Sequence, residues 1–183
     1  EHPMRLITSS TNSATYFISS WLSEFLKNNL PPSDLSVKNS FEFVKIVSDF
    51  KVPKDHCFVS FDVVSLFNNI YFEAVHRAVE SIWHILVLKI NISFDNFLEI
   101  VKFIMFNNYF VFNNKFYRQR FGSAMGSPVS PALADLVMRN ILNIALKTCP
   151  HSVLFFKMYV DDCFLCIPKD KINEVLDHFN SID

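Results

Sequence analysis

The chain has 183 residues, of which 50% are apolar and 19% charged, which suits one compact domain and excludes a disordered polypeptide. Its formal net charge is −1, and lysine and arginine occur singly, so no basic stripe typical of nucleic-acid binders stands out. No uncharged apolar run is long enough to span a bilayer. The 21 phenylalanines are expected mainly to fill the core, with only some placed to stack on bases.

The N-terminal part is predicted to be mainly helical. Residues 4–10 form a short extended stretch, and apolar residues then recur at helical spacing over 15–30 until two prolines end the helix. A second helix is expected over 40–50. Residues 57–62 predict a buried strand with an acid at its C-terminal end.

The middle of the chain predicts two more helices and a hairpin. The helices cover 71–86 and 94–107, the latter with Ser93 as N-cap. Strands over 109–112 and 116–119 flank Asn113-Asn114-Lys115, a turn signal because asparagine tolerates left-handed conformations.

A loop over 122–131 then leads into a helix over 132–147. The C-terminal part predicts a second hairpin, with strands over 153–159 and 163–167 joined by Val160-Asp161-Asp162. An amphipathic helix over 169–181 follows. No linker or repeat interrupts these elements, so we expect a single α+β domain.

Two acidic sites lie in apolar surroundings: Asp62 at a strand end, and Asp161-Asp162 at a hairpin tip. Taken separately, such aspartates are ordinary turn residues. If the strand lies beside the hairpin, the three carboxylates converge and repel one another unless a cation neutralises them. Hard oxygen ligands suit Mg²⁺, and two such ions can support nucleotidyl transfer.

Other catalytic sets find little support in the sequence. Two glycines cannot build a phosphate-binding loop or a dinucleotide fingerprint, and no H-E-x-x-H or G-x-S-x-G pattern occurs. Cys163 and Cys166 fall on a predicted strand, where side chains three positions apart face opposite sides, so we expect core thiols rather than a zinc site.

Three strings resemble those of reverse transcriptases. S-F-D-V-V-S-L-F-N-N-I (60–70), F-G-S-A-M-G-S-P-V-S-P-A-L-A-D (121–135) and M-Y-V-D-D-C-F-L (158–165) occur in the family's order and spacing. In detail they resemble the Penelope-like retroelement branch, which is related to telomerase. M-R-L-I-T-S-S (4–10) and K-N-S-F-E-F-V (38–44) extend the similarity over nearly the whole chain.

The resemblance implies a catalytic site with two Mg²⁺ ions, for which Mn²⁺ can substitute. Asp62 and Asp161 would be the metal-binding aspartates, and Asp162 their catalytic neighbour with a more variable contribution to metal binding. The Val63 carbonyl would be an additional ligand. Each of these roles comes from the matching motif position.

The resemblance also implies a set of nucleotide-binding residues. Ser65 and Leu66 would offer backbone N–H groups to the triphosphate, and Phe67 would be the steric gate that excludes a ribose 2′-hydroxyl. Met125 and Gly126 would lie along the template base and incoming nucleotide, where Gly126 permits close backbone approach. Arg5 would approach the triphosphate or the template.

The implied fold is a polymerase palm, a ferredoxin-like antiparallel sheet backed by helices. Residues 1–55 would be a fingers remnant with leading helices and 56–183 the palm, truncated before the thumb. The implied reaction is RNA-directed DNA synthesis from dNTPs on a primed RNA or DNA template, in the nucleus. The thumb, and a nuclease domain that many relatives carry, would belong to the parent polypeptide. We expect the isolated fragment to have weak or no activity and an exposed sheet edge.

Two alternatives stay open at this point. A decayed or domesticated palm would bind nucleic acid or partners without catalysis. A palm-type RNA polymerase would use the same carboxylates, but a bulky side chain at Phe67 argues against it.

Overall fold

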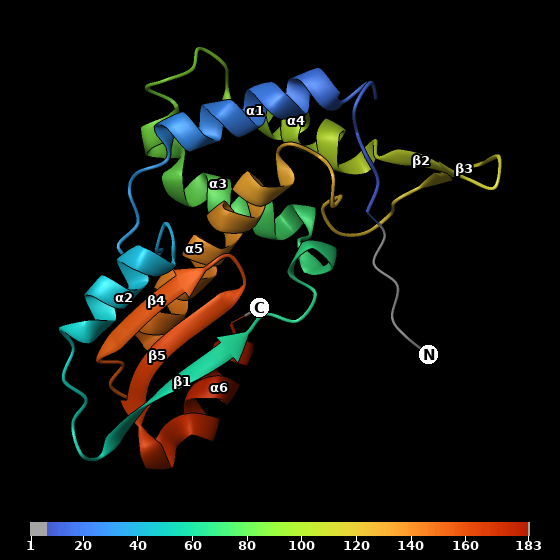
Figure 1. Ribbon diagram of the computed structural model, residues 1–183. Helices are drawn as coiled ribbons and strands as arrows, with labels where there is room; N and C mark the ends of the chain where they lie inside the picture. The colour runs from blue at the N-terminus through green and yellow to red at the C-terminus, as the bar shows by residue number, and fades with distance from the viewer. Residues whose placement is uncertain (1–6, 183) are drawn as a thin grey trace. The chain divides into compact units, whose positions relative to one another are not determined.

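The computed structural model describes residues 7–182, which divide into two compact units, each made of two separate stretches of the chain (Figure 1). The first, here the helical unit, contains the residues up to Pro31 together with Ser65–Val137. The second, the sheet unit, contains Pro32–Val64 and the residues from Met138 onward. The expected division between residues 55 and 56 stays a prediction, since the compact units separate at other points.

The helical unit is a small helix bundle with a hairpin that projects from it (Figure 1). Its core centres on Phe97, which is fully buried and contacts the rings of Phe25 and Trp83 from two other helices. The elements are α1 (Tyr16–Asn29), the 3₁₀ helix η1 (Leu66–Asn69), α3 (Phe72–Leu86), α4 (Phe94–Phe106), β2 (Tyr109–Phe112), β3 (Lys115–Arg118) and the first part of α5 (Ser130–Thr148).

The sheet unit contains three antiparallel strands in the order β1-β5-β4. It comprises α2 (Ser40–Ser48), β1 (His56–Asp62), the last part of α5, β4 (Phe155–Tyr159), β5 (Asp162–Pro168), the 3₁₀ helix η2 (Lys169–Lys171) and α6 (Ile172–Asn180). Long-range pairing holds β1 in place, because its described partner strand, β5, comes much later in the chain.

Aromatic residues fix one helix on each face of this sheet (Figure 1). On one face, Phe43 of α2 packs edge-on against Phe164 of β5, with ring centroids 5.1 Å apart. On the other face, Phe179 of α6 contacts both Phe61 of β1 and Phe156 of β4. This alternation explains why the strands are rich in phenylalanine on both sides.

The two edges of the sheet differ. The outer edge of β4 is partly covered by the segment before α2, because the Met158 N–H donates to the Leu35 carbonyl at 2.7 Å and the Val37 N–H to the Met158 carbonyl at 3.0 Å. No strand among residues 7–182 pairs with the outer edge of β1. The β1 edge therefore matches the predicted open edge.

The predicted α+β class is confirmed, and most predicted elements occur within a few residues of their expected bounds. Ser93 is the N-cap of α4, with its hydroxyl accepting from the Asn96 N–H at 3.2 Å. Among residues 7–182, no helix has the length and apolar character needed to cross a membrane.

Three predicted boundaries were wrong. Asp162 belongs to β5 rather than to the hairpin turn, and Lys115 belongs to β3. In both hairpins the turn is one residue shorter than predicted, because two-residue turns with left-handed residues match the twist of the strands. The last helix is also shorter, because its first three residues form the 3₁₀ turn η2.

Candidate active site

The sheet unit brings the three predicted catalytic aspartates together. Asp62, the last residue of β1, is directly opposite Asp162, the first residue of β5. Beyond this pair, the Val63 N–H donates to the Asp161 carbonyl at 3.1 Å, which continues the ladder into the hairpin turn. Residues far apart in sequence therefore lie on adjoining backbone, as the carboxylate hypothesis requires.

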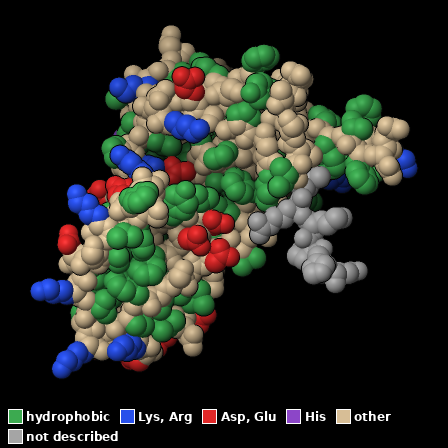
Figure 2. Space-filling model, viewed as in Figure 1, with side chains coloured by type: hydrophobic (Ala, Val, Ile, Leu, Met, Phe, Trp, Pro, Cys, Tyr) green, Lys and Arg blue, Asp and Glu red, His purple; other side chains and the backbone are tan. Residues whose placement is uncertain are grey.

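Strand geometry determines which carboxylates share a face. Directly opposite residues in an antiparallel pair point to the same side, so Asp62 and Asp162 share the face on which α2 packs. Both side chains are exposed, whereas Asp161 in the turn is half-buried. Figure 2 shows acidic side chains gathered over this end of the β4–β5 hairpin.

The hairpin turn itself carries backbone strain. It consists of Val160 and Asp161, and Val160 has φ 58°, a left-handed conformation that is unfavourable for a β-branched residue. Such outliers persist only where the surrounding structure imposes them. Here the β4–β5 ladder and the Val63–Asp161 hydrogen bond hold both sides of the turn.

The electrostatic field of the aspartates is felt by the thiol of Cys163. Burial, followed by the negative charges of Asp162, Asp161 and Asp62, raises the pKa of Cys163 to about 12. The thiol therefore stays protonated at neutral pH and is a poor nucleophile or metal ligand.

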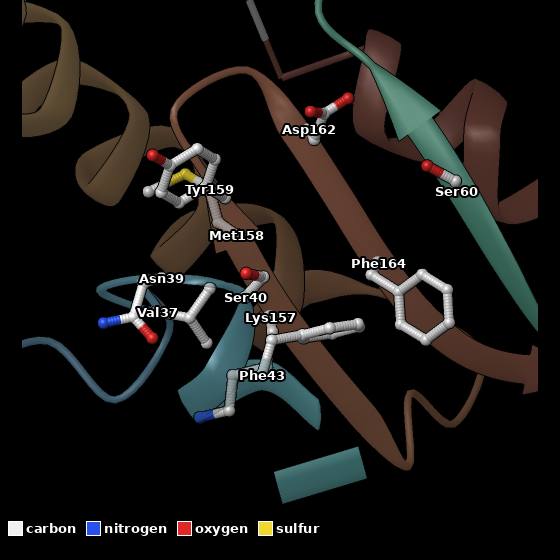
Figure 3. Close-up of a pocket in the computed structure, with 10 residues that line it drawn as sticks. All are labelled: Val37, Asn39, Ser40, Phe43, Ser60, Lys157, Met158, Tyr159, Asp162 and Phe164. Atoms are coloured by element: carbon white, nitrogen blue, oxygen red, sulfur yellow. The ribbon is translucent and has the colours of Figure 1, made fainter. Parts of the chain in front are cut away.

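A hollow of about 410 Å³ adjoins Asp162 between α2 and the sheet (Figure 3). Asp162 lies at one end of it, and the rings of Phe43 and Phe164 lie deeper along the sheet face. Tyr159 and Lys157 of β4 and Ser60 of β1 also line it. The exposed carboxylate of Asp162 therefore borders a hollow whose wall includes aromatic rings.

The donor set suits a hard divalent cation in chemical type. Aspartate oxygens from two strands and a turn are the ligands that Mg²⁺ prefers, and Mg²⁺ completes its shell with water and substrate phosphates. As the side chains stand, however, no group of three His, Cys, Asp or Glu within residues 7–182 is arranged to hold a metal ion. To hold a metal ion, the three carboxylates would have to turn toward a common point.

The predicted nucleotide-binding residues lie in the helical unit. Ser65 adopts a left-handed conformation, with φ 54°, and begins η1, which contains Leu66 and Phe67. The Phe67 carbonyl accepts a hydrogen bond from the Ser123 N–H at 2.7 Å. The steric-gate candidate is thereby tied to the loop over 122–131, although its nucleotide role stays a prediction.

Glycine at position 126 permits a close approach, but to the chain itself. A Cβ atom there would lie 1.9 Å from the Thr8 carbonyl oxygen, and the Gly126 φ of 147° disfavours other residues. The Ser10 hydroxyl donates to the Gly126 carbonyl at 2.7 Å, and Met125 forms a parallel bridge with Ile7. The loop is thus anchored on residues 7–10. Arg5 lies outside the described residues.

Gly122 is a structural residue that sequence reasoning did not single out. Its φ is 73°, and an added Cβ would come within 2.6 Å of the carbonyl oxygens of Phe67 and Asn68. Glycine at this position lets the loop pack directly on the turn that carries the steric-gate candidate. The signal was available, because the chain has only two glycines and both fall in this loop.

Comparison with known proteins identifies the family. The model for reverse transcriptase (RNA-dependent DNA polymerase) matches residues 9–182. The chain belongs to the reverse transcriptase family. No curated protein sequence is similar enough to match it.

Solved telomerase structures share the fold of this reverse transcriptase domain. Apo telomerase from Candida tropicalis, truncated from its C-terminal domain, has a TM-score of 0.64 and 16% identity over 92% of this chain. Telomerase from Candida albicans, in complex with a fragment of telomeric RNA, has a TM-score of 0.65 and 13% identity over 94% of it. The domain covers 37% and 32% of those chains, respectively, so it spans about a third of their length.

Family membership confirms the resemblance to reverse transcriptases that the sequence shows. Members of this family use divalent metal ions. The Penelope-like assignment and the individual roles of the site residues stay predictions.

Proposed function

We propose that this chain is the catalytic core of an RNA-directed DNA polymerase from a retroelement of the Penelope-like kind. The proposal is supported by the register of the sheet unit, in which Asp62 lies directly opposite Asp162 and the Val63 N–H donates a hydrogen bond to the Asp161 carbonyl. Three carboxylates on adjoining backbone in a reverse transcriptase domain suit nucleotidyl transfer from a dNTP to a primer 3′-hydroxyl.

In the proposed mechanism, Asp62, Asp161 and Asp162 would hold two Mg²⁺ ions, which Mn²⁺ could replace. Bound metal would supply activation of the 3′-hydroxyl and neutralisation of the triphosphate charge. The Val63 N–H is engaged by Asp161 and fixes the strand end, which leaves the Val63 carbonyl as the candidate ligand.

The helical unit would select the nucleotide. Phe67 would exclude the ribose 2′-hydroxyl, and the backbone N–H groups of Ser65 and Leu66 would bind the triphosphate. Gly122 supports this role indirectly, because it lets the loop carrying Met125 and Gly126 pack on the Phe67 carbonyl. Arg5 would add positive charge near the triphosphate or template.

The proposed partners are an RNA or DNA template with its primer, and the thumb and nuclease segments of a longer parent polypeptide, acting in the nucleus. The test is primer extension on an RNA template with Mg²⁺, using the parent polypeptide. Asp161→Asn and Asp62→Asn should each abolish extension, whereas Asp177→Asn, at an exposed position on α6, should not. Equal extension by all variants would remove these acids from the mechanism.

A second candidate function is a palm that binds nucleic acid without catalysis. One observation favours it: no three metal-ligating side chains in the described part of the chain are arranged around a common point. Titration of Mn²⁺ in the presence of primer–template and dNTP separates the candidates. A catalytic domain takes up metal in a nucleotide-dependent way, and a decayed one does not.

A further inference from the structure

The β2–β3 hairpin exposes aromatic side chains on both of its faces. Seven of its eight strand residues are exposed, and Phe110 is the only half-buried one. The exposed fraction reaches 82% for Phe116 and 66% for Phe112. A two-stranded hairpin ordinarily turns one apolar face inward and leaves a polar face in water, so this pattern is not explained by folding of the helical unit.

The hairpin is nevertheless well defined. Asn113 and Asn114 both adopt left-handed conformations, with φ of 52° and 57°, as a type I′ turn requires. Phe110 and Tyr117 stack across the strands with centroids 5.4 Å apart and an interplanar angle of 16°. At the base, the Gln119 N–H donates to the Asn108 carbonyl at 2.9 Å. A regular scaffold therefore presents the exposed rings.

The charge of this region identifies the kind of partner. Between residues 100 and 134 the sequence contains no aspartate or glutamate, and the cations of the hairpin and its exit are Lys115, Arg118 and Arg120. Figure 2 shows hydrophobic side chains over the projecting hairpin and a basic side chain at its end. Phosphate groups complement such a surface, and a basic or neutral partner surface would gain less from it.

The register places a cation beside an exposed ring on each face. Arg118 is directly opposite Tyr109 on one face, and Lys115 is directly opposite Phe112 on the other. Directly opposite side chains have Cβ atoms roughly 5 Å apart. Each pair can thus stack on a base while its cation contacts the backbone phosphate, which is how proteins bind single strands without reading sequence.

We propose that the β2–β3 hairpin is a stacking platform for single-stranded nucleic acid, and that it holds the unpaired template strand. The proposal rests on the proposed function only for the identity of the strand as template. Binding itself needs neither metal nor dNTP, so the platform and the catalytic site can fail independently of each other.

The first test separates base stacking from general hydrophobicity. The probe is a fluorescein-labelled single-stranded RNA of mixed sequence without self-complementarity, titrated with the 183-residue chain without metal or dNTP. Phe112→Leu/Phe116→Leu keeps apolar bulk but removes the rings, and should weaken binding by about tenfold or more. Phe112→Tyr/Phe116→Tyr keeps the rings and should bind as tightly as the native chain.

The second test counts phosphate contacts. Lys115→Gln/Arg118→Gln/Arg120→Gln should reduce the slope of log affinity against log salt by about 2, given roughly 0.7 per phosphate contact on a single strand. Phe112→Leu/Phe116→Leu should lower the affinity for RNA but leave the slope of log affinity against log salt unchanged. Matched controls on α1, Phe17→Leu and Lys27→Gln, remove an exposed ring and an exposed cation elsewhere in the helical unit and should change neither quantity.

Native affinity in the leucine pair would overturn the proposal. The proposal would also fail if the leucine substitutions changed self-association, measured by sedimentation, but left RNA binding unchanged. The hairpin would then be a contact between protein chains. Asp161→Asn distinguishes the proposals from each other. It should abolish extension by the parent while RNA binding by the hairpin stays intact.

Discussion

Asp62 lies directly across the β1–β5 ladder from Asp162, so two carboxylates of like charge face the same side of the sheet at neighbouring positions. Most proteins avoid this arrangement, because directly opposite like charges destabilise a strand pair. The energetic cost is removed when a cation binds between them. If the proposed metal ion binds here, stability and metal binding are therefore linked at this pair.

The first prediction follows from that linkage. Without divalent metal, Asp162→Asn should raise the free energy of unfolding by about 0.2–1 kcal/mol, because it removes the repulsion with Asp62. Chemical denaturation in EDTA and in Mg²⁺ measures this, and the gain should disappear in Mg²⁺. Asp177→Asn is the control for loss of one surface charge. A destabilised Asp162→Asn variant, or a gain that Mg²⁺ leaves unchanged, would contradict the linkage.

The second prediction concerns sugar selection by Phe67. Phe67→Ala should increase rNTP incorporation by the parent polypeptide about 10–200-fold relative to dNTP, the range by which an apolar pocket discriminates one small group. The measurement is kcat/KM for matched nucleotide pairs. Tyr71→Ala removes an exposed ring four positions further along and should leave the ratio unchanged. An unchanged ratio in Phe67→Ala would show that this ring packs against protein only.

The third prediction concerns the anchoring of the loop on residues 7–10. Gly126→Ala should lower the free energy of unfolding by more than about 2 kcal/mol, because its methyl group would collide with the Thr8 carbonyl in an unfavourable backbone conformation. Amide hydrogen exchange should rise first at residues 7–10. Asn114→Gly, which also changes a left-handed position, should be neutral or stabilising. Native stability in Gly126→Ala would refute the contact.

The fourth prediction concerns pH and α6. The Lys171 ammonium and the His151 ring each donate a hydrogen bond to the Glu174 carboxylate at 2.8 Å. These contacts, the one from Lys171 most strongly, lower the pKa of Glu174 from its ordinary value of 4.5. A carboxyl group whose pKa is lower in the folded state stabilises the fold when the pH is above its unfolded-state pKa. This stabilisation is lost as the pH falls through the folded-state pKa.

Glu174→Gln should therefore be less stable than the native chain at neutral pH, and the difference should shrink as the pH falls below 4.5. Thermal unfolding between neutral and acidic pH measures this difference. Glu80→Gln, at an exposed position on α3, is the control and should show no such pH dependence. A pH-independent difference would mean that Glu174 acts through packing alone.

Local sequence patterns predicted most of the elements and the proximity of the three candidate catalytic aspartates. Periodicity located the helices, and the strand ending in Asp62 and the hairpin bearing Asp161 were both expected. The register could not be predicted, because pairing between β1 and β5 depends on packing across distant segments rather than on nearby residues. As a result Asp162, expected in the turn, proved to be the direct partner of Asp62.

Two other features were hidden for different physical reasons. A close backbone approach at Gly126 was predicted, but to the template base and incoming nucleotide. In the structure the atoms that approach Gly126 belong to Thr8, which is distant in sequence. Whole-chain net charge and aromatic content do not indicate the hairpin surface, because acidic residues elsewhere balance its cations. The local sequence does indicate it, since the stretch around Lys115 and Arg118 contains no acidic residue.

The late pairing of β1 has a consequence for biosynthesis. This strand leaves the ribosome well before its partner β5 has been synthesised. At a synthesis rate of roughly 5–20 residues per second, β1 therefore stays unpaired for several seconds or more. During that time an apolar strand is unpaired on both edges, which exposes the nascent chain to aggregation and to chaperone capture. A chain truncated between the two strands should therefore be insoluble. Once β5 has been synthesised, it pairs with one edge of β1 and places Asp62 opposite Asp162.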